Sequence, residues 1–431
     1  MTADKLMKLK KILVWFRNDL RLHDNEMLVE AIAKSDFILP VYFFDPRHFT
    51  STTFDTLKTG INRTNFLLES ISALRAQFQK LGGDLMIVIG KPEEQISDIV
   101  TAYEISEVYH HREVGPEETN ISAMVEDVLW KQKVNLKHFI GHTLYNKEDL
   151  PFPIKDIPDV FAQFKKKTER DAILKACFEA PESVSFIEAE EWGMLPELKD
   201  LGFDTSGVTS FNTEFKGGEE AGLEHMTDLL AEGSEIYKKS NAKNSGEKFN
   251  SKLSRWLALG CLSPRRVYWM IKAAEQRFGT NQNFNQILLG LLYRDYYRFM
   301  FKKHGIKFFQ ESEFESQIQS PEKTDDYLMD QWKNGQTGHP LVDRYMKELV
   351  ATGFISHTAR LLVATYLVHI LKIHWTNGAS YFEEKLIDYS AASNWGNWAN
   401  VAGAGLDLKS KMFDVDKQIK ALELDLSKVS A

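Results

Sequence analysis

Cysteine is scarce in this chain, which has two, Cys177 and Cys261, among 431 residues. Two cysteines build no disulfide framework and are typical of a protein that works in a reducing compartment. Long apolar runs are missing too, since no stretch approaches the ~18 consecutive apolar residues that a membrane-spanning helix requires. The apolar run near the basic N-terminus is too short for a secretory signal. These absences favour a cytoplasmic protein with no membrane partner.

Positive charge is in deficit, with 53 lysines and arginines against 61 aspartates and glutamates and a net charge of −8. This balance argues against a protein that coats itself with nucleic acid, although a local basic face is compatible with an acidic total. The hydrophobic fraction of 43% is typical of a globular chain. At 431 residues the chain exceeds one ordinary core, so we expect two domains.

Several signals of enzyme chemistry are also missing. The segment RNDLRLHDN, after the first expected strand, has no glycine, and a dinucleotide fingerprint needs glycines there. His110 and His111 are adjacent and would point to opposite faces of a strand, so no Cys or His set has metal spacing. Neither G-x-S-x-G nor a Walker-type loop occurs. An enzyme here would need a cofactor to supply the reactivity.

The first third of the chain alternates short β-branched or aromatic runs with helical patterns. This alternation predicts βαβ units and a five-stranded parallel sheet that is covered on both faces. We therefore expect an α/β domain over residues 8–141. The expected strands are residues 11–16, 37–44, 84–90, 106–111 and 135–141.

Prolines and polar residues interrupt this pattern from about residue 142, which predicts an interdomain linker over residues 142–212. From residue 213 to residue 431 nearly every segment has a helical period, and glycine ends many of these segments, as helix C-caps do. The second domain is therefore expected to be all-α. Its main helical patterns cover residues 217–233, 284–305, 341–353 and 357–373.

Two segments of the helical part have the composition of binding sites. Ser251, Lys252 and Ser254 lie where a helix would begin, and hydroxyls, free N–H groups and a positive dipole end together favour an anion such as phosphate. The alternative is that Ser254 is an ordinary N-cap and Lys252 a solvated charge. Residues 293–307 interleave aromatic rings with cations, as a single-strand nucleic-acid site does. An amphipathic helix with snorkelling cations gives the same pattern.

A third group of candidates lies near the C-terminus. Arg360 is a cation in an otherwise apolar helical segment and needs a partner, for which Asp388 is the candidate. Asn394 and Trp398 are four apart and share a helix face, and Trp375 would lie beyond Trp398 in a short series of oxidisable rings. The alternative is that these rings are ordinary core packing.

Six motifs occur along the chain in this order: KILVWFRNDLRLHDNEML, EFKGGEEAG, SKLSRWLALGCLSPRRVYW, WKNGQTGHPLVDRYMKELVATGF, DYSAASNWGNW and FDVDKQ. Together they resemble the photolyase/cryptochrome family, and FKGGE with SNWGNW resembles its DASH branch. The resemblance runs from about residue 11 to about residue 417. It implies an α/β antenna domain, a long linker and a helical domain that holds FAD folded into a U.

The resemblance assigns roles to individual residues. Arg360 and Asp388 match the ion pair beside the isoalloxazine, and Asn394 matches the residue that faces flavin N5. Trp398 and Trp375 match the inner two electron-transfer tryptophans, so Asn394, Trp398 and Trp375 are the candidate catalytic residues. The matches to the flavin phosphate and ribityl contacts are Tyr237, Asn250, Ser251, Lys252, Leu253 and Ser254.

The resemblance also implies an activity. Blue light excites the family's reduced flavin, which passes an electron to a cyclobutane pyrimidine dimer, and the DASH branch prefers single-stranded DNA. A folate antenna, methenyltetrahydrofolate, is usual between the domains, and Glu113 is its candidate contact. We expect a monomer.

This sequence departs from the family pattern on the lesion side. Gly290 replaces a glutamate that bonds the dimer, Tyr293 replaces its partner tryptophan, and Arg294 follows as a candidate DNA contact. Losing charge-assisted bonds in a dry pocket costs ~1.5–3 kcal/mol each. A photoreceptor or nucleic-acid-binding flavoprotein without repair therefore stays open as the alternative, beside weak repair. The remaining departures are His357 and Thr358 at the lesion, Ser390 in place of a second flavin-pocket aspartate, and Glu322 at the outermost tryptophan, where Tyr327 is a candidate substitute.

Overall fold

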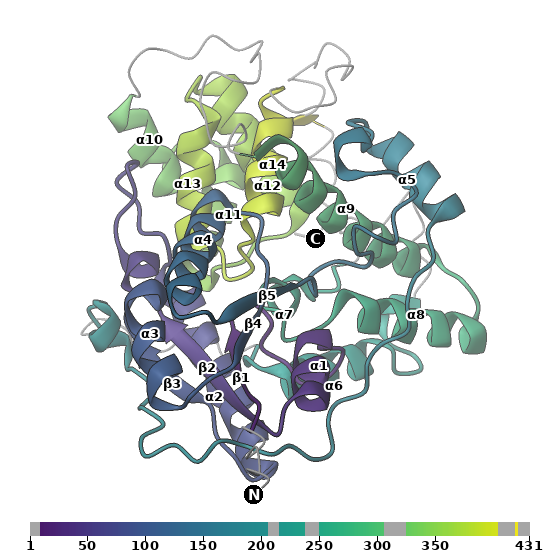
Figure 1. Cartoon of the computed structure of the whole chain (residues 1–431). Coiled ribbons are helices and arrows are strands. Elements are labelled where there is room, and N and C mark those ends of the chain that lie inside the picture. The colour runs from purple at the N-terminus through teal and green to yellow at the C-terminus, as the bar shows by residue number, and fades with distance from the viewer. Residues whose placement is uncertain (1–8, 206–214, 238–249, 306–324, 404–418, 421–431) are drawn as a thin grey trace, which may run out of the picture.

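The computed structural model describes residues 9–205, 215–237, 250–305, 325–403 and 419–420. A parallel sheet with helices on both faces lies beside a helical region, as Figure 1 shows. The strand order is β3-β2-β1-β4-β5, and every pairing is parallel. The predicted fold class, an α/β part with five parallel strands followed by a helical part, is thereby confirmed. The strands are β1 Lys11–Phe16, β2 Phe37–Phe44, β3 Met86–Ile89, β4 Glu107–His111 and β5 Asn135–Phe139.

Alternate residues of each strand enter different cores. In β1, Ile12 and Val14 belong to the core that reaches the helical region, whereas Leu13 and Trp15 belong to the other core. Helices α1 and α2 cover the first face, and α3 and α4 cover the second. Because both faces are buried, the strands are almost continuously apolar. The helices are α1 Glu26–Lys34, α2 Ile61–Lys80, α3 Pro92–Ala102 and α4 Pro116–Lys131.

The segment after β5 has little regular structure, as its prolines predict. Its one α-helix among the described residues is α5, Phe161–Asp171, and two short 3-10 turns lie at Ile154–Asp156 and Leu198–Leu201. The expected domain boundaries at residues 141 and 212 stay predictions, and the second lies in 206–214, outside the described residues.

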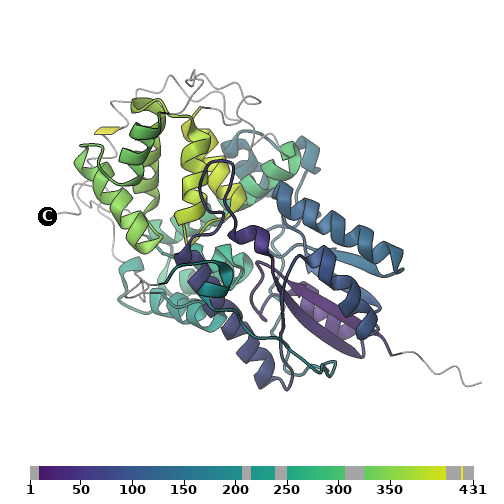
Figure 2. The ribbon, with the colours of Figure 1, turned by 90° about the vertical axis from the view of Figure 1, so that its left-hand side faces the viewer.

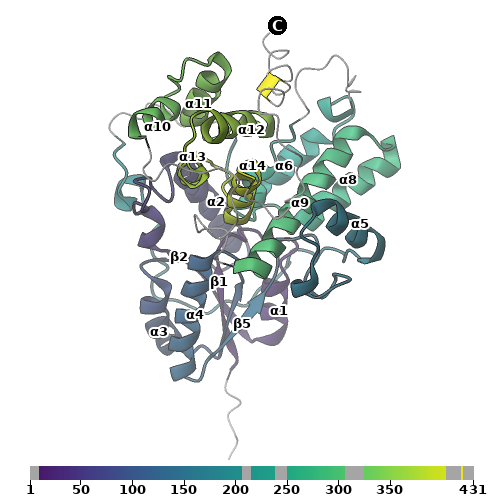
Figure 3. The same cartoon turned by 90° about the horizontal axis from the view of Figure 1, so that it is seen from above.

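The second half is helical, and α14 lies near its centre. Figure 3 shows α14 among its neighbours α9, α12 and α13, which all contact it. The pattern over 357–373 predicts one helix, but α12 ends at Thr365 and a π-helical turn follows at Tyr366–Ile370. The elements are α6 Glu219–Leu229, α7 Ser254–Ala258, α8 Pro264–Phe278, α9 Gln282–His304, α10 Asp326–Lys333, α11 Pro340–Thr352, α12 His357–Thr365, α13 Trp375–Lys385 and α14 Ala391–Val401. In the described part of the chain, no helix is long and apolar enough to cross a membrane.

A buried arginine joins the two halves of the molecule. Arg21, in the loop after β1, has no exposed surface and donates to four main-chain carbonyls. The acceptors are the carbonyl oxygens of His23, Asp24, Gly141 and Gly260, at 2.8–3.1 Å. Because these carbonyls come from the loop after β1, the residues just after β5 and the helical region, one side chain fixes three segments.

Further polar contacts reinforce this junction. The Asp24 carboxylate accepts from the Arg265 guanidinium at 2.7 and 3.0 Å, and Glu219 accepts from the main-chain N–H groups of Leu22 and His23. A second junction forms where the loop after β2 reaches α13, as Figure 2 shows from the side. There the hydroxyls of Thr56 and Ser380 are 2.6 Å apart.

Replacing Arg21 with alanine should destabilise the whole chain. The change leaves four buried carbonyl groups without their donor, and each unsatisfied group costs ~1–3 kcal/mol. We therefore expect the free energy of unfolding from denaturant titration to fall by at least about 3 kcal/mol. Arg170→Ala is the control, because Arg170 is exposed and its ion-pair partner among the described residues is the exposed neighbour Asp171. Equal denaturation midpoints for both variants would contradict this stabilising role of Arg21.

Candidate functional site

The helical region contains a pocket that collects most of the C-terminal candidates. It encloses about 510 Å³ of space between α12, α13 and α14, part of it open to solvent. Its walls include Arg360, Asp388, Ser390, Asn394 and Trp398, which the sequence placed around one ligand, and also His357. Residues from three helices and from the turn before α14 thus converge on one cavity.

Asp388 is the centre of the polar wall of this pocket. Its carboxylate accepts two bonds from Arg360 Nη2, at 3.0 and 2.9 Å, and one from Ser254 Oγ, at 2.6 Å. Burial raises the pKa of Asp388, but the Arg360 charge and the bonds from Arg360 and Ser254 outweigh burial and lower the pKa below its usual value. Asp388 is therefore ionised, and the expected pair with Arg360 is formed.

The expected anion site of Ser251, Lys252 and Ser254, here called the corner, lies next to this wall. The Ser254 hydroxyl bonds Asp388 and caps no helix; the N-cap of α7 is Leu253. Lys252 adopts a left-handed backbone with φ 55°, and its N–H donates to Asn250 Oδ1 at 3.0 Å. The Ser251 carbonyl accepts from the His225 ring at 2.9 Å. The Ser254–Asp388 bond therefore connects the corner to the pocket.

Tyr237 lies outside that pocket's lining. Its hydroxyl donates to the Leu230 carbonyl at 2.8 Å, and its ring packs against Phe278 and Phe284. The hydroxyl of Tyr237 is therefore used within the chain, and its ring belongs to the packing between α8 and α9.

Small residues let α14 pack closely on its neighbours. A Cβ at Gly396 would collide with the Tyr297 ring, and a Cβ at Gly378 on α13 would collide with the Trp398 ring. The Asn394 side chain donates from Nδ2 to the Ala379 carbonyl at 2.9 Å, which fixes the orientation of the amide. The neutral side chain of Asn394 is thus held at a set position in the pocket wall.

The tryptophans of helices α10, α13 and α14 form two groups. Trp398 contacts Phe382 and Trp332, with ring centroids 5.0 and 6.2 Å apart. Trp375, expected beyond Trp398, packs edge-on against Trp395 at 5.8 Å. Trp332, on α10, is fully buried, and sequence spacing missed it because the contact joins segments 66 residues apart.

Two residues are candidates for the outermost redox position. Tyr327, on the same helix as Trp332, is 69% exposed, and Glu322 lies outside the described residues. The structure therefore leaves the role of Tyr327 as a prediction.

The lesion-side candidates are divided between two surfaces. Gly290 and Tyr293 lie on the outer side of α9; a Cβ at Gly290 would meet no atom within 4 Å, and Tyr293 is 39% exposed. His357 is exposed at the pocket and Thr358 is half-buried beside it. Arg294 is not on this surface, because its guanidinium points inward and donates to the Leu257 carbonyl at 2.8 Å.

Two further cations of α9 are also engaged inside the molecule, whereas Lys302 is exposed. Arg298 pairs with Glu113 at 2.9 Å, and Lys303 pairs with Asp159 at 2.7 Å and donates to the Ile157 carbonyl. The interleaved rings and cations of residues 293–307 therefore act largely as a packing helix. This observation favours the amphipathic interpretation for these cations.

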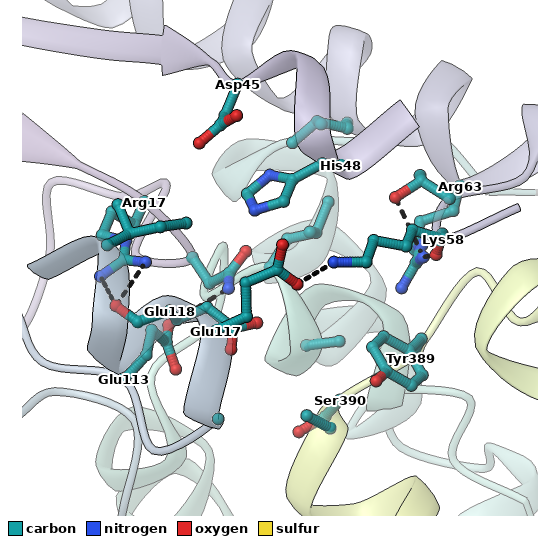
Figure 4. Close-up of a pocket in the computed structure, with 18 of the residues that line it drawn as sticks. Arg17, Asp45, His48, Lys58, Arg63, Glu113, Glu117, Glu118, Tyr389 and Ser390 are labelled. Carbon is teal, nitrogen blue, oxygen red and sulfur yellow. Dashed lines mark hydrogen bonds and ion pairs between the residues drawn. The ribbon is translucent and has the colours of Figure 1, made fainter. Parts of the chain in front are cut away.

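A larger pocket lies between the sheet and the helical region, and Glu113, the candidate antenna contact, is part of its lining. It encloses about 1250 Å³ including open solvent, and Figure 4 shows its charged lining. The pocket opens at the carboxyl ends of β1 and β2, where β1 has β2 on one side and β4 on the other. Parallel sheets commonly bind ligands at such a switch point, so the predicted parallel sheet was a usable signal. Labelled in Figure 4 are Arg17, Asp45, His48, Lys58, Arg63, Glu113, Glu117, Glu118, Tyr389 and Ser390.

Carboxylates and cations alternate around this second pocket. Glu113 accepts from Asn18 at 3.1 Å and from Arg298 at 2.9 Å. Although burial raises the pKa of Glu113, the nearby His142 and Arg298 hold it far below its usual value. Burial and the Glu113 charge raise the pKa of Glu118. The pocket thus contains two carboxyl groups whose pKa values are shifted in opposite directions.

The two pockets share a wall. Tyr389 and Ser390 line both of them. The Tyr389 hydroxyl accepts from Trp395 Nε1 at 3.2 Å, and the Arg63 guanidinium lies 4.5 Å from the centre of the Tyr389 ring. Burial raises the pKa of the neighbouring Glu383 to about 7. A ligand in either pocket would therefore lie close to a ligand in the other.

Comparison with known proteins identifies the family. The DNA photolyase family matches residues 12–182, and the FAD binding domain of DNA photolyase matches residues 287–427. Cryptochrome DASH of Gloeobacter violaceus is 40% identical over 424 residues, which cover 97% of this chain and 84% of the relative.

Two solved structures share the fold. The cryptochrome of Synechocystis sp. PCC6803 superposes with a TM-score of 0.89 at 36% identity and covers 97% of this chain and 88% of its own. A class III photolyase from Agrobacterium tumefaciens, with a TM-score of 0.82, 22% identity and coverage of 99% and 88%, shows the fold alone. The chain therefore belongs to the DASH cryptochromes of the photolyase/cryptochrome family.

Proposed function

We propose that this chain is a blue-light-absorbing FAD protein that acts by light-driven electron transfer on cyclobutane pyrimidine dimers in single-stranded DNA. The observation that carries the proposal is the pocket where Arg360, Asp388 and Asn394 converge, inside the part of the chain with an FAD-binding domain. When bound, FAD supplies the light absorption and the transferred electron. The free thiols Cys177 and Cys261 support a reducing compartment such as the cytoplasm.

The residues present fit a flavin. Arg360 and Asp388 place a neutralised ion pair at the pocket wall, and Asn394 places a fixed, uncharged amide beside it. A neutral amide tolerates either protonation state of the group that it faces, whereas a carboxylate would favour the protonated one. Ser254 connects this wall to the corner of Ser251 and Lys252, which is proposed for the phosphates.

The internal use of cations supports single-stranded DNA as the substrate. Extruding a base from a duplex costs a few kcal/mol, which duplex contacts must supply. Arg294, Arg298 and Lys303 of α9 are bonded within the molecule, which leaves Lys302 as its exposed lysine, so α9 offers little grip on phosphates. A dimer in a single strand avoids most of the cost of extrusion.

A photoreceptor without repair remains the second candidate. The space beside Gly290 supports it, because a Cβ there would meet no atom within 4 Å and the acidic side chain of the family pattern is missing. Without that acceptor, the affinity for a dimer is expected to be low.

The repair proposal can be tested on ultraviolet-irradiated oligothymidine incubated with reduced, flavin-loaded protein under blue light. We expect the dimer content, measured by chromatography, to fall over many equivalents. Gly290→Glu should raise the rate about tenfold or more at low substrate, because a charge-assisted bond is worth ~1.5–3 kcal/mol. Gly290→Ala is the matched control for helix stabilisation alone. Dimer content that stays at the dark level in both wild type and Gly290→Glu would exclude repair and leave the photoreceptor.

Asp388→Asn should weaken FAD retention. The substitution removes the charge that Arg360 pairs with and one of the acceptor oxygens, so the pocket wall carries an uncompensated cation. We expect the flavin-to-protein ratio after gel filtration to fall severalfold while circular dichroism keeps its helical signal. Asp330→Asn, at an exposed position on α10, is the control. Full flavin content in Asp388→Asn would disprove this role.

The pocket at the sheet edge is proposed for a folate antenna, methenyltetrahydrofolate. Carboxyl groups there suit the N–H donors of a pterin, and Arg17, Lys58 and Arg63 suit an acidic tail. Glu113, the predicted contact, lines the pocket but already accepts from Asn18 and Arg298, so the neighbouring Glu118 joins it as a proposed contact.

Val114→Trp should test the antenna site. A larger side chain at this lining position reduces the space of the pocket at the sheet edge and lies outside the lining of the other. After incubation with folate and gel filtration, we expect severalfold less bound folate by fluorescence, with unchanged FAD. Equal folate in variant and wild type, or none in either, would reject this site.

A further inference from the structure

The wall between the two pockets contains a tyrosine whose hydroxyl lies beside a carboxylate. Tyr389 lines both pockets, and Glu383, on α13, lines the pocket at the sheet edge. Trp395 Nε1 lies 3.2 Å from the Tyr389 hydroxyl oxygen and 3.3 Å from Glu383 Oε2. Because Trp395 donates to the hydroxyl oxygen, the hydroxyl proton is left to bond Glu383, and this bond lowers the pKa of the carboxylate. The phenolic proton therefore has an acceptor inside the molecule.

The groups that face Glu383 hold its pKa close to neutral pH. Burial raises the pKa to about 7, and the Glu118 charge acts in the same direction. The charges of Arg63 and Lys58 and the bond from Tyr389 oppose burial. A base whose pKa is near the working pH both accepts and releases a proton readily. Glu383 is therefore suited to receive a proton and to pass it on.

Arg63, on α2, limits the charge that the Tyr389 ring can carry. Its guanidinium lies 4.5 Å from the ring centre, is 7% exposed, and is held by bonds to the Lys58 carbonyl and the Thr59 hydroxyl. Figure 4 shows Arg63 and Tyr389 on the same side of the pocket. A cation is attracted to the face of a neutral ring but repels a positively charged one. Oxidation of Tyr389 is therefore favourable only when the phenolic proton leaves with the electron.

The tryptophans of the site have other surroundings. Trp332 Nε1 donates to the Val363 carbonyl at 3.0 Å, and a main-chain carbonyl does not take up a proton. Trp375 Nε1 is buried and has no hydrogen-bond partner among the described residues. An indole that is oxidised at either position keeps its proton, whereas Tyr389 can transfer its proton to Glu383.

We propose that Tyr389 is a proton-coupled electron donor to the ligand of the Asp388 pocket and that Glu383 receives its phenolic proton. This role rests on the proposed function, because the oxidant is the photo-excited oxidised flavin of that pocket. One electron leaves Tyr389, its O–H bond breaks, and the proton binds the Glu383 carboxylate. A neutral tyrosyl radical and a carboxylic acid result. A thiol then returns a hydrogen atom to the radical, and Glu383 releases its proton to solvent through the pocket at the sheet edge.

The test uses the flavin-loaded full chain with oxidised flavin, without DNA, under blue light. Infrared difference spectra report the proton on Glu383 as a carboxylic acid band that appears on illumination. Electron paramagnetic resonance of samples frozen during illumination reports the tyrosyl radical, and ring-deuterated tyrosine distinguishes it from tryptophan. We expect both signals in wild type and neither in Tyr389→Phe. Glu383→Gln should lose the carboxylic acid band and form the radical in severalfold lower yield.

The pH profile is a second, independent readout. In wild type the radical yield should rise as the pH increases through about 7, because only the ionised form of Glu383 accepts the proton. Glu383→Gln should remove this dependence. Tyr103→Phe, at the end of α3 and outside the lining of both pockets, is the matched control and should leave both signals unchanged. Flavin content and circular dichroism report whether each variant is folded.

The outcomes separate this inference from the proposed function. An undiminished radical signal in Tyr389→Phe, or no radical in flavin-loaded wild type, overturns the role of Tyr389. A carboxylic acid band that persists in Glu383→Gln overturns the role of Glu383. If Tyr389→Phe retains no flavin, the comparison of wild type with Glu383→Gln decides. Wild type that shows both signals but repairs no dimers keeps this inference and rejects repair, and a chain that binds no flavin rejects both.

Discussion

A buried carboxylate cannot remain ionised without partners, and this constraint organises the helical region. Asp388 is 8% exposed, and its partners Arg360 and Ser254 come from α12 and α7. Their bonds fix the turn before α14, and α14 in turn carries Asn394 and Trp398 into the pocket wall. Breaking such a pair by removing one partner costs more than never having formed it. The pair of Asp388 and Arg360 is therefore costly to disrupt, and it fixes the positions of the residues that line the pocket.

The bonds of Arg21 fix the position of the sheet, as those of Asp388 fix the position of α14. By bonding carbonyls from the loop after β1, from Gly141 after β5 and from Gly260 between α7 and α8, Arg21 holds the carboxyl edge of the sheet against the helical region. The larger pocket exists because these two parts meet at that edge, and Tyr389 and Ser390 form its wall with the first pocket. Because the two pockets share this wall, ligands bound in them would lie close together.

Local patterns predicted the parts of this structure that depend on local physics. The limits of β1 and β2 agree with the predicted strands, since an apolar run buried on both faces marks them. The pair of Arg360 and Asp388 was predictable because a cation in an apolar helix needs a counter-charge. The helix over 357–373 was predicted too long, because its apolar period continues through the π-helical turn after Thr365.

Features that depend on contacts between distant segments were not predictable in this way. Trp332 touches Trp398 from a helix 66 residues earlier, and the stack of Phe161 on Tyr293 joins the linker to α9. Composition suggested that Arg294 faces a ligand, but its neighbours turn it toward the Leu257 carbonyl. Residue type and spacing state what a side chain can do, whereas its partner is decided by tertiary packing.

The central claim is that the pocket around Asp388 holds one FAD. The absorption spectrum of the purified full-length chain, after incubation with excess FAD and gel filtration, tests this most directly. We predict a flavin band in the blue with close to one FAD per chain. A chain that stays colourless although circular dichroism shows it to be folded would contradict the account.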